Sequence, residues 1–348
     1  MQLSPGGYAP RLNIPGNNLE HVYTFRERND AEAVKARMAD AKKVIVIGAG
    51  YIGIEVAEAF VRNGLEVTVL DAVDRFLPTY LDKEFYPRLS AEAENKGLTF
   101  KGKEFAQEVL DENGIVTGLV TDQGEYEADT IIMACGVKPD TDWLKGTLDV
   151  DKKGFVLTNE FLETSAEDVY AGGDATYLNF NPTGKEMNIG LATNARKQGV
   201  VAAKNALGDK VKAAGVNGTS GLAFFDLNFA TTGIKDSLIE NYDGEVKAYY
   251  CEEKIHPDFM RNEDNTVEMK IFYDADTEVI LGAQFLSKED ITQAANTLSL
   301  ATTAKMTLTE LAQADFFFQP GFSRPWHFLN VLALRAQGQT YGSTEMLF

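Results

Sequence analysis

The most informative pattern along the chain is an apolar run, a helical stretch and a second apolar run in its first quarter. Val44 to Ile47 is a continuous β-branched run, typical of a parallel strand buried on both faces. From Ile54 to Asn63 apolar residues recur at helical spacing, and Gly64 ends the stretch. Glu66 to Leu70 alternates as a strand that ends in Asp71. The pattern predicts a strand, a helix and a parallel strand.

The flanking segments extend this unit. Leu3 to Gly16 is crowded with proline and glycine and predicts an irregular connector, whereas Ala31 to Ala39 favours a short helix capped by Asn29 and Asp30. Downstream, turn residues divide short apolar runs as in a meander, and Gly136 and Pro139 mark a boundary. The predicted strands here are Leu98–Lys101, Phe105–Leu110, a run up to Tyr126, and Thr130–Ala134.

The second half of the chain shows two further patterns. Val169 to Ala171 predicts a short strand before Gly172-Gly173-Asp174, and a long helix is expected from about Met187 to Ala206. From Gly218 onward strands precede helices, which indicates an α+β module. Its expected strands lie around Leu222–Phe229, Glu245–Cys251, Val267–Phe272 and Val279–Phe285, and its helical stretches begin at Ile291 and Thr307.

Size and charge narrow the function classes. A chain of 348 residues favours two or three domains, and no apolar stretch is long enough for a membrane span. A formal net charge of −19 disfavours nucleic acid and anionic membranes as partners. The N-terminus lacks the features of a secretory signal, so we expect a cytoplasmic protein. The two cysteines, Cys135 and Cys251, form no CxxC spacing, and no metal site is predicted.

The glycine pattern between the first strand and helix indicates a dinucleotide site. Gly48 permits a tight turn, Gly50 lets the backbone approach a diphosphate, and Gly53 brings helix and strand close together. The amides and dipole of the helix N-terminus favour an anion there. Asp71 would bind the adenine ribose hydroxyls and repel a 2′-phosphate, so we expect NADH to be preferred to NADPH, although Arg75 lies nearby.

A second candidate site involves Gly173-Asp174. Alone, this sequence is also compatible with a simple turn stabilised by an aspartate hydrogen bond. Its partner is the small-residue entry to the next helix, Asn188 to Asn194, against which a flat ring could lie. The positive end of that helix would stabilise an anionic reduced flavin.

Together these motifs resemble the flavoprotein disulfide reductase superfamily, and within it NADH peroxidase and water-forming NADH oxidase. The resemblance extends over essentially the whole chain and rests on several motifs in the same order. They are Leu3–Gly6, Gly48–Gly53, Leu81–Phe85, Trp143–Gly146, Gly173–Thr176, Ala192–Gly199 and Ala314–Pro320.

The resemblance implies an α/β protein with a Rossmann-type NAD-binding domain, a partial FAD-binding domain and a C-terminal α+β dimerisation domain. The implied boundaries are 1–11 for a remnant of the FAD-binding domain, 12–136 for the NAD-binding domain, 137–217 for the second FAD-binding segment and 218–348 for the dimerisation domain. By resemblance, the cofactors are NADH and FAD and the protein is a homodimer. Phe316 to Pro320 would reach toward the partner's active site, although such a run alone more often belongs to a core.

The implied cofactor contacts fall into two groups. Tyr51 would gate the nicotinamide position over the flavin. The other NADH contacts would be Gly48, Gly50, Ile52, Gly53, Asp71, Tyr80, Gly136 and Gly221. The flavin contacts would be Ser4 to Gly7, Asp174, Gly190, Leu191 and Ala192.

The chain departs from the family in residues that the resemblance makes catalytic. Family members begin with an FAD-binding βαβ unit, a catalytic histidine and a redox cysteine, and none of these is matched here. His21, His256 and His327 are expected to be ordinary surface or packing residues, and neither cysteine matches the redox cysteine. No catalytic residue is therefore assigned, and we expect the chain to be inactive or impaired, as an internal start or an interrupted gene would make it.

Three functional interpretations follow. The first is an FAD-dependent NADH peroxidase by descent, which passes electrons from NADH through flavin to a cysteine sulfenic acid. The second is a water-forming NADH oxidase, which shares nearly all of these motifs, with coenzyme A disulfide reductase as a more distant relative. The third is a non-catalytic NADH-binding or dimerisation fragment.

Overall fold

The computed structural model describes residues 1–260 and 265–339. They form two compact units, and each is built from three separate segments of the chain. Unit 1 comprises 1–79, 86–177 and 188–213, and unit 2 comprises 80–85, 178–187 and the chain from 214. The predicted C-terminal domain at 218–348 thus includes residues 261–264 and 340–348, which lie outside the described part. In that part, no helix is long and apolar enough to cross a membrane.

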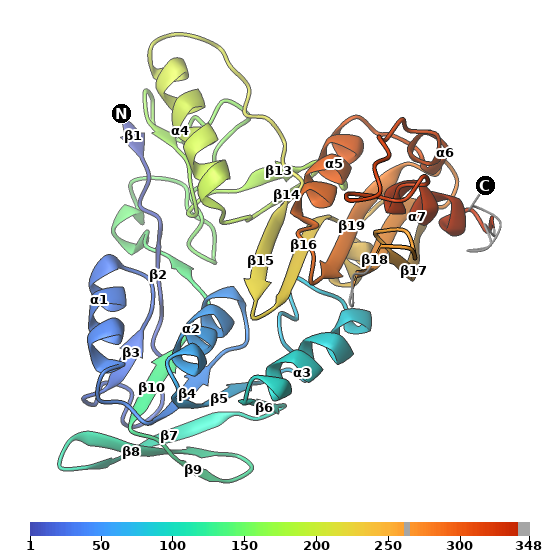
Figure 1. Cartoon of the computed structure of the whole chain (residues 1–348). Coiled ribbons are helices and arrows are strands. Elements are labelled where there is room, and N and C mark those ends of the chain that lie inside the picture. The colour runs from blue at the N-terminus through green and yellow to red at the C-terminus, as the bar shows by residue number, and fades with distance from the viewer. Residues whose placement is uncertain (261–264, 340–348) are drawn as a thin grey trace. The chain divides into compact units, whose positions relative to one another are not determined.

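Unit 1 is built around a parallel five-stranded sheet in the order β3-β10-β4-β5-β6 (Figure 1). The central strand β4 places Val44 beside Val67 and Ile47 beside Leu70 of β5. Strand β4 is apolar from Val44 to Ile47, as expected for a strand covered on two faces, whereas β5 alternates polar and apolar residues up to Leu70. The sheet strands are β3 (Val22–Thr24), β4 (Lys43–Ile47), β5 (Glu66–Asp71), β6 (Leu98–Gly102) and β10 (Thr130–Met133).

Four α-helices belong to unit 1: α1 (Arg28–Arg37), α2 (Tyr51–Arg62), α3 (Tyr86–Asn95) and α4 (Ala192–Ala206). The predicted cap of α1 was wrong. Glu27 is the N-cap, and Asp30 completes a capping box from inside the first turn. Helix α3 was not predicted, although Phe85, Leu89 and Ala93 are buried at helical spacing.

The predicted start of α4 at about Met187 was also wrong. Lys185–Met187 forms strand β14, and a loop then leads to Leu191, the N-cap of α4. Asn188 supports this loop because its side chain donates hydrogen bonds to the Asp174 and Thr176 carbonyls at 2.9 and 3.1 Å. A helix through residue 188 would withdraw these bonds, so α4 begins only at Ala192.

Smaller sheets complete unit 1. An antiparallel meander, β7-β8-β9, covers one side, and its apolar residues share a core with those of β10. The N-terminal connector is more regular than predicted, because β1 pairs with β12 and β2 pairs with β11. These strands are β1 (Gln2–Leu3), β2 (Gly7–Tyr8), β7 (Ala106–Glu112), β8 (Ile115–Thr121), β9 (Glu125–Glu127), β11 (Lys138–Pro139) and β12 (Tyr170–Ala171).

Unit 2 contains an antiparallel five-stranded sheet in the order β15-β16-β19-β18-β17. The expected strand at 222–229 is two strands joined by a tight turn, in which Phe225 has a φ of 52°. The five strands of this sheet are β15 (Ser220–Phe224), β16 (Leu227–Gly233), β17 (Val246–Lys254), β18 (Thr266–Asp274) and β19 (Ile280–Ser287). A separate antiparallel pair consists of β13 (Leu178–Phe180) and β14 (Lys185–Met187).

Three helices pack against this sheet: α5 (Thr292–Thr303), α6 (Leu308–Ala312) and α7 (Phe328–Ala336). Leu298, Leu308 and Leu332 are fully buried in the shared core. By contrast, Phe317 and Phe318 are 72% and 47% exposed, so the core interpretation of that aromatic run is wrong for these two residues. Short 3-10 helices lie at Lys83–Phe85, Asp142–Leu144 and Asp236–Asn241.

His327 has a structural role at the start of α7. Its Nδ1 accepts a hydrogen bond from the Leu329 amide at 3.2 Å, and its ring stacks between Phe316 and Phe328. Burial lowers the pKa of His327 to about 4, so the imidazole stays neutral and can cap the helix. The sequence led us to expect an ordinary surface or packing residue at His327, and these contacts are those of a packing residue.

This cap predicts a pH dependence of stability. Because the folded pKa lies below the ordinary value, the unfolded chain binds more protons between about pH 6.5 and about pH 4. The free energy of unfolding should therefore decrease as the pH is lowered through that window, by at most about 1.4 kcal/mol per pH unit. In His327→Asn the side chain can still cap but cannot titrate. Urea unfolding at several pH values should show a smaller slope for the variant, and equal slopes would contradict this assignment.

Candidate cofactor sites

The glycine-rich turn lies between β4 and α2, as predicted. Gly48 has a φ of 111°, which a residue with a side chain rarely adopts. A Cβ on Gly53 would overlap the Gly48 carbonyl oxygen, whereas a Cβ on Gly50 would have no neighbour within 4 Å. Gly53 is thus needed for packing, while Gly50 borders open space at the N-terminus of α2. This is the arrangement that lets a diphosphate approach the backbone.

Asp71, at the end of β5, faces this turn. Its carboxylate accepts hydrogen bonds from the Ala49 amide at 2.6 Å and from the Val73 amide at 3.0 Å. A carboxylate has about four acceptor positions, so two remain for ribose hydroxyls. Arg75, which left the NADH preference open, pairs with Asp74 at 3.1 Å, and Lys103 lies 3.4 Å from the same carboxylate.

The other predicted NADH contacts are divided between the units. Tyr51 and Ile52 form the first turn of α2, and Gly136 follows β10, all in unit 1. Tyr80 and Gly221 belong to unit 2. In that unit, the Lys235 ammonium lies over the Tyr80 ring, 5.3 Å from its centroid, and Gly221 pairs with Ala230 in the sheet.

The predicted flavin contacts converge within unit 1. Strand β1 lies beside β12, which brings the segment containing Ser4 and Gly7 to the loop of Asp174. A Cβ on Gly190 would lie 3.3 Å from Asp174 Oδ1, so the loop before α4 passes closely over this carboxylate. Leu191 is the N-cap of α4, and Ala192 is its first residue. Ser4, Gly190 and Ala192 are exposed and leave the helix N-terminus accessible.

One residue at this site was missed by the sequence analysis. Arg26 follows β3, and its Nη2 donates a hydrogen bond to Asp174 Oδ2 at 2.7 Å. Its Nε donates to the Gly7 carbonyl at 3.2 Å. Arg26 and Asp174 are 148 residues apart in the sequence, so no local pattern indicated the contact.

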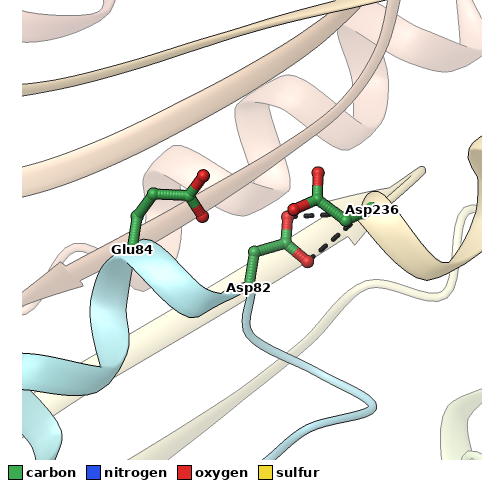
Figure 2. Close-up of side chains that lie close together, drawn as sticks. All are labelled: Asp82, Glu84 and Asp236. Carbon is green, nitrogen blue, oxygen red and sulfur yellow. Dashed lines mark hydrogen bonds between the residues drawn. The ribbon is translucent and has the colours of Figure 1, made fainter.

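A second charged cluster lies within unit 2. Asp82, Glu84 and Asp236 bring carboxylate oxygens within 4.8 Å of one another (Figure 2). The Lys270 ammonium lies 3.1 Å from Asp82, 3.1 Å from Glu84 and 2.8 Å from Asp236. Lys270 is 3% exposed. The carboxylates therefore already have a cation between them, and the cluster is an ion-pair network rather than a metal centre.

Neither cysteine is a suitable redox thiol. Burial, reinforced by the charge of Asp71, raises the pKa of Cys135 to about 11. Burial also raises the pKa of Cys251 to about 11. Because the thiolate is the reactive form, both thiols are protonated and unreactive at neutral pH. The prediction that neither acts as the family's redox cysteine agrees with this chemistry.

The residues at the first site fit NADH, and the residues at the second site fit FAD. The turn at Gly48–Gly53 has the open backbone and the acidic residue that NADH requires. At the second site, Asp174 is oriented next to a helix N-terminus that carries no acidic residue in its first turn. This arrangement fits an anionic cofactor with hydroxyl groups, as FAD is.

Comparison with known proteins identifies the family of this chain. The family model for pyridine nucleotide-disulphide oxidoreductases matches residues 3–199, and the model for their dimerisation domain matches residues 219–328. The NADH oxidase of Enterococcus faecalis is 40% identical over 324 residues, which are 93% of this chain and 72% of that protein. The CoA-dependent NAD(P)H sulfur oxidoreductase of Pyrococcus furiosus is 32% identical, over 94% of this chain and 74% of that protein.

A solved structure gives the same result. The water-forming NADH oxidase from Lactobacillus brevis, bound to NADH, has a TM-score of 0.92 and 34% identity, and the match covers 97% of this chain and 74% of that one. The predicted superfamily, fold class and cofactors are thereby confirmed. The chain belongs to the pyridine nucleotide-disulphide oxidoreductases, an α/β family of oxidoreductases that bind FAD and NADH.

Proposed function

We propose that this chain oxidises NADH through FAD and that molecular oxygen, reduced to water, is the electron acceptor. The observation that carries the proposal is the turn at Gly48–Gly53 with Asp71 at the end of the adjacent strand. The names of the relatives support oxygen over peroxide, because the Enterococcus and Lactobacillus proteins are both NADH oxidases. The first interpretation from the sequence, an NADH peroxidase, becomes the second candidate.

The residues of the chain have distinct roles in this proposal. The first-turn amides of α2 bind the NADH diphosphate, and Asp71 binds the adenine ribose. Asp174, with Gly190 to Ala192 before and at the start of α4, holds the flavin, and Tyr51 gates the nicotinamide position. When bound, FAD supplies a hydride acceptor that can pass electrons on to another molecule.

Hydrogen peroxide remains the second candidate acceptor because the chain shares its quoted motifs with NADH peroxidase as well. In the family, that reaction uses a cysteine sulfenic acid, and the raised pKa values of Cys135 and Cys251 disfavour both for this role. The family resemblance gives the redox cysteine to oxidases and peroxidases alike, so the preference for oxygen rests on the names of the relatives.

The stoichiometry of the reaction distinguishes the candidates. Reduction of oxygen to water consumes two NADH per oxygen molecule and accumulates no peroxide. A peroxidase consumes NADH only when peroxide is added, one for one, and also without oxygen. An oxygen electrode combined with NADH absorbance gives both ratios. Absence of NADH oxidation with either acceptor, in a chain that binds NADH, would leave the non-catalytic NADH-binding fragment and contradict the proposal.

Asp71 should determine the choice between NADH and NADPH. In Asp71→Asn the negative charge that repels a 2′-phosphate is removed, while the side-chain oxygen can still accept the Ala49 or Val73 amide. The NADH to NADPH affinity ratio should fall by about tenfold to a hundredfold. Fluorescence titration with both nucleotides measures it. Glu32→Gln is the control, since Glu32 is an exposed carboxylate that pairs with Arg28 on α1, and an equal shift in both variants would contradict the role of Asp71.

The assembly and compartment follow from the same proposal. The dimerisation-domain match supports a homodimer, and the exposed Phe317 and Phe318 in unit 2 are available for an interface. Oxidation of NADH requires the cytoplasmic nucleotide pool, so we place the protein in the cytoplasm. The substrates proposed here are small molecules, and neither nucleic acid nor a membrane is a proposed partner. The boundaries of the four predicted domain segments stay predictions.

A further inference from the structure

Arg26 connects three segments that the proposed function assigns to the flavin. Its guanidinium donates to Asp174 Oδ2 at 2.7 Å and to the Gly7 carbonyl at 3.2 Å. The third segment is Gly190, whose position lies against the other oxygen of Asp174. All of these residues belong to unit 1. Arg26 therefore contacts two of these segments directly, at Gly7 and Asp174, and is linked to the third, at Gly190, through Asp174.

The two oxygens of Asp174 have different surroundings. Oδ2 accepts the hydrogen bond from Arg26, whereas Oδ1 faces Gly190 with a gap that would place a Cβ 3.3 Å away. The backbone of Asp174 is also held, because its carbonyl accepts a hydrogen bond from Asn188 at 2.9 Å. With backbone and Oδ2 fixed, Oδ1 is presented toward the loop before α4. This is the oxygen available to a hydroxyl group of a ligand.

The charge of the pair is as important as its geometry. FAD carries a diphosphate, and an unneutralised carboxylate nearby would repel it. The side chains of Arg26 and Asp174 are 29% and 24% exposed, so water screens their charges only in part. The guanidinium cancels the carboxylate charge without occupying both of its oxygens. An arginine is suited to this because its donors lie in one plane and cannot be deprotonated.

We propose that Arg26 is a positioning residue of the flavin site, which holds Asp174 with Oδ1 directed to a hydroxyl of the flavin's ribityl chain and neutralises its charge. This inference rests on the proposed function, because it assumes that Asp174 contacts FAD. It assigns to Arg26 no direct contact with the cofactor. The residue acts through Asp174, and its loss should affect FAD without affecting NADH.

The test compares two arginines near the start of α1. Arg28 is the matched control, because it pairs with Glu32 one turn along the helix and its side chain is 89% exposed. FAD affinity of the full chain is measured by quenching of flavin fluorescence for the wild type, Arg26→Met, Arg26→Lys and Arg28→Met. Arg26→Met should weaken FAD binding about tenfold to a hundredfold, Arg26→Lys should restore part of it, and Arg28→Met should match the wild type.

Two further readouts separate positioning from folding. NADH affinity and the urea midpoint should be unchanged in Arg26→Met, since the Gly48–Gly53 turn is independent of this pair. In an Asp174→Ala background, Arg26→Met should cause no further loss of FAD affinity.

Each contrary result has one meaning. Equal FAD affinities of Arg26→Met and Arg28→Met, with a wild type that binds FAD, would overturn the inference and leave the proposed function standing. A further tenfold loss in the Asp174→Ala background would overturn the positioning role by showing that Arg26 acts on the cofactor itself. A midpoint that falls in Arg26→Met, while Arg26→Lys binds FAD no better, would show that the pair only stabilises the fold. A wild type that binds no FAD would refute the proposed function.

Discussion

Replacing Lys270 with methionine should destabilise unit 2 by about 3 kcal/mol. Lys270 is 3% exposed and lies within 3.1 Å of three carboxylates. Removing one partner of a buried ion pair typically costs about 3 to 5 kcal/mol, because the other charges remain without compensation. Glu84 and Asp236 are 26% and 42% exposed and can recover part of their hydration, so the lower end applies.

The loss of stability in Lys270→Met should depend on pH, because the pKa of Asp82 determines how much charge is left without a partner. Burial raises the pKa of Asp82 above its ordinary value even with Lys270 beside it. Without Lys270, mutual repulsion of the carboxylates would raise it further. A carboxyl whose folded pKa is raised is stabilising below its unfolded pKa and loses that contribution as pH rises through the folded pKa. The deficit of Lys270→Met should therefore be smaller at about pH 5 than at about pH 7.5.

Denaturant unfolding monitored at both pH values tests this. Lys247→Met is the matched control, because Lys247 lies on the neighbouring strand β17 and is exposed. It should change the free energy of unfolding by less than about 0.5 kcal/mol. Equal stabilities of the two variants at neutral pH would contradict a stabilising role of the ion pairs that Lys270 forms with the three carboxylates.

Substitutions at Gly53 and Gly50 should both weaken NADH binding but should differ in their effect on stability. In Gly53→Ala the added methyl group overlaps the Gly48 carbonyl oxygen, so α2 must move away from β4. The backbone cannot yield as a flexible side chain would, and we expect a loss of about 3 kcal/mol or more, together with loss of NADH binding. In Gly50→Ala the methyl group meets no atom within 4 Å, so the fold should be retained within about 1 kcal/mol.

The affinity of Gly50→Ala for NADH is the decisive quantity. Its methyl group would stand in the space through which a diphosphate approaches the backbone, so binding should weaken at least about tenfold although the protein stays folded. Thermal unfolding and NADH titration of the two variants give the comparison. If Gly50→Ala binds NADH as the wild type does, the diphosphate does not lie at this turn.

Local patterns predicted the parts of the structure that are specified within one segment. The run Val44–Ile47, the turn at Gly48–Gly53 and the strand ending in Asp71 were predicted correctly, because period, glycine geometry and strand length act over a few residues. The start of α4 was misplaced because the Asn188 side chain holds its loop through bonds to residues 12 and 14 positions away.

Long-range contacts were beyond such patterns. Lys270 lies 186 residues from Glu84, and Arg26 lies 148 residues from Asp174. Each is an ordinary charged residue in its own segment, and only the fold gives it a partner. The assignments of Tyr51, Gly136 and Gly221 to NADH come from the family resemblance and stay predictions.

The most direct test of the account is an anaerobic titration of the FAD-loaded chain with NADH, followed by its visible absorbance. If the Gly48–Gly53 turn and the Asp174 site serve one electron transfer, the flavin absorbance should bleach in proportion to the NADH added and return when oxygen is admitted. A chain that retains FAD and binds NADH while its flavin spectrum stays unchanged would contradict the proposed electron transfer.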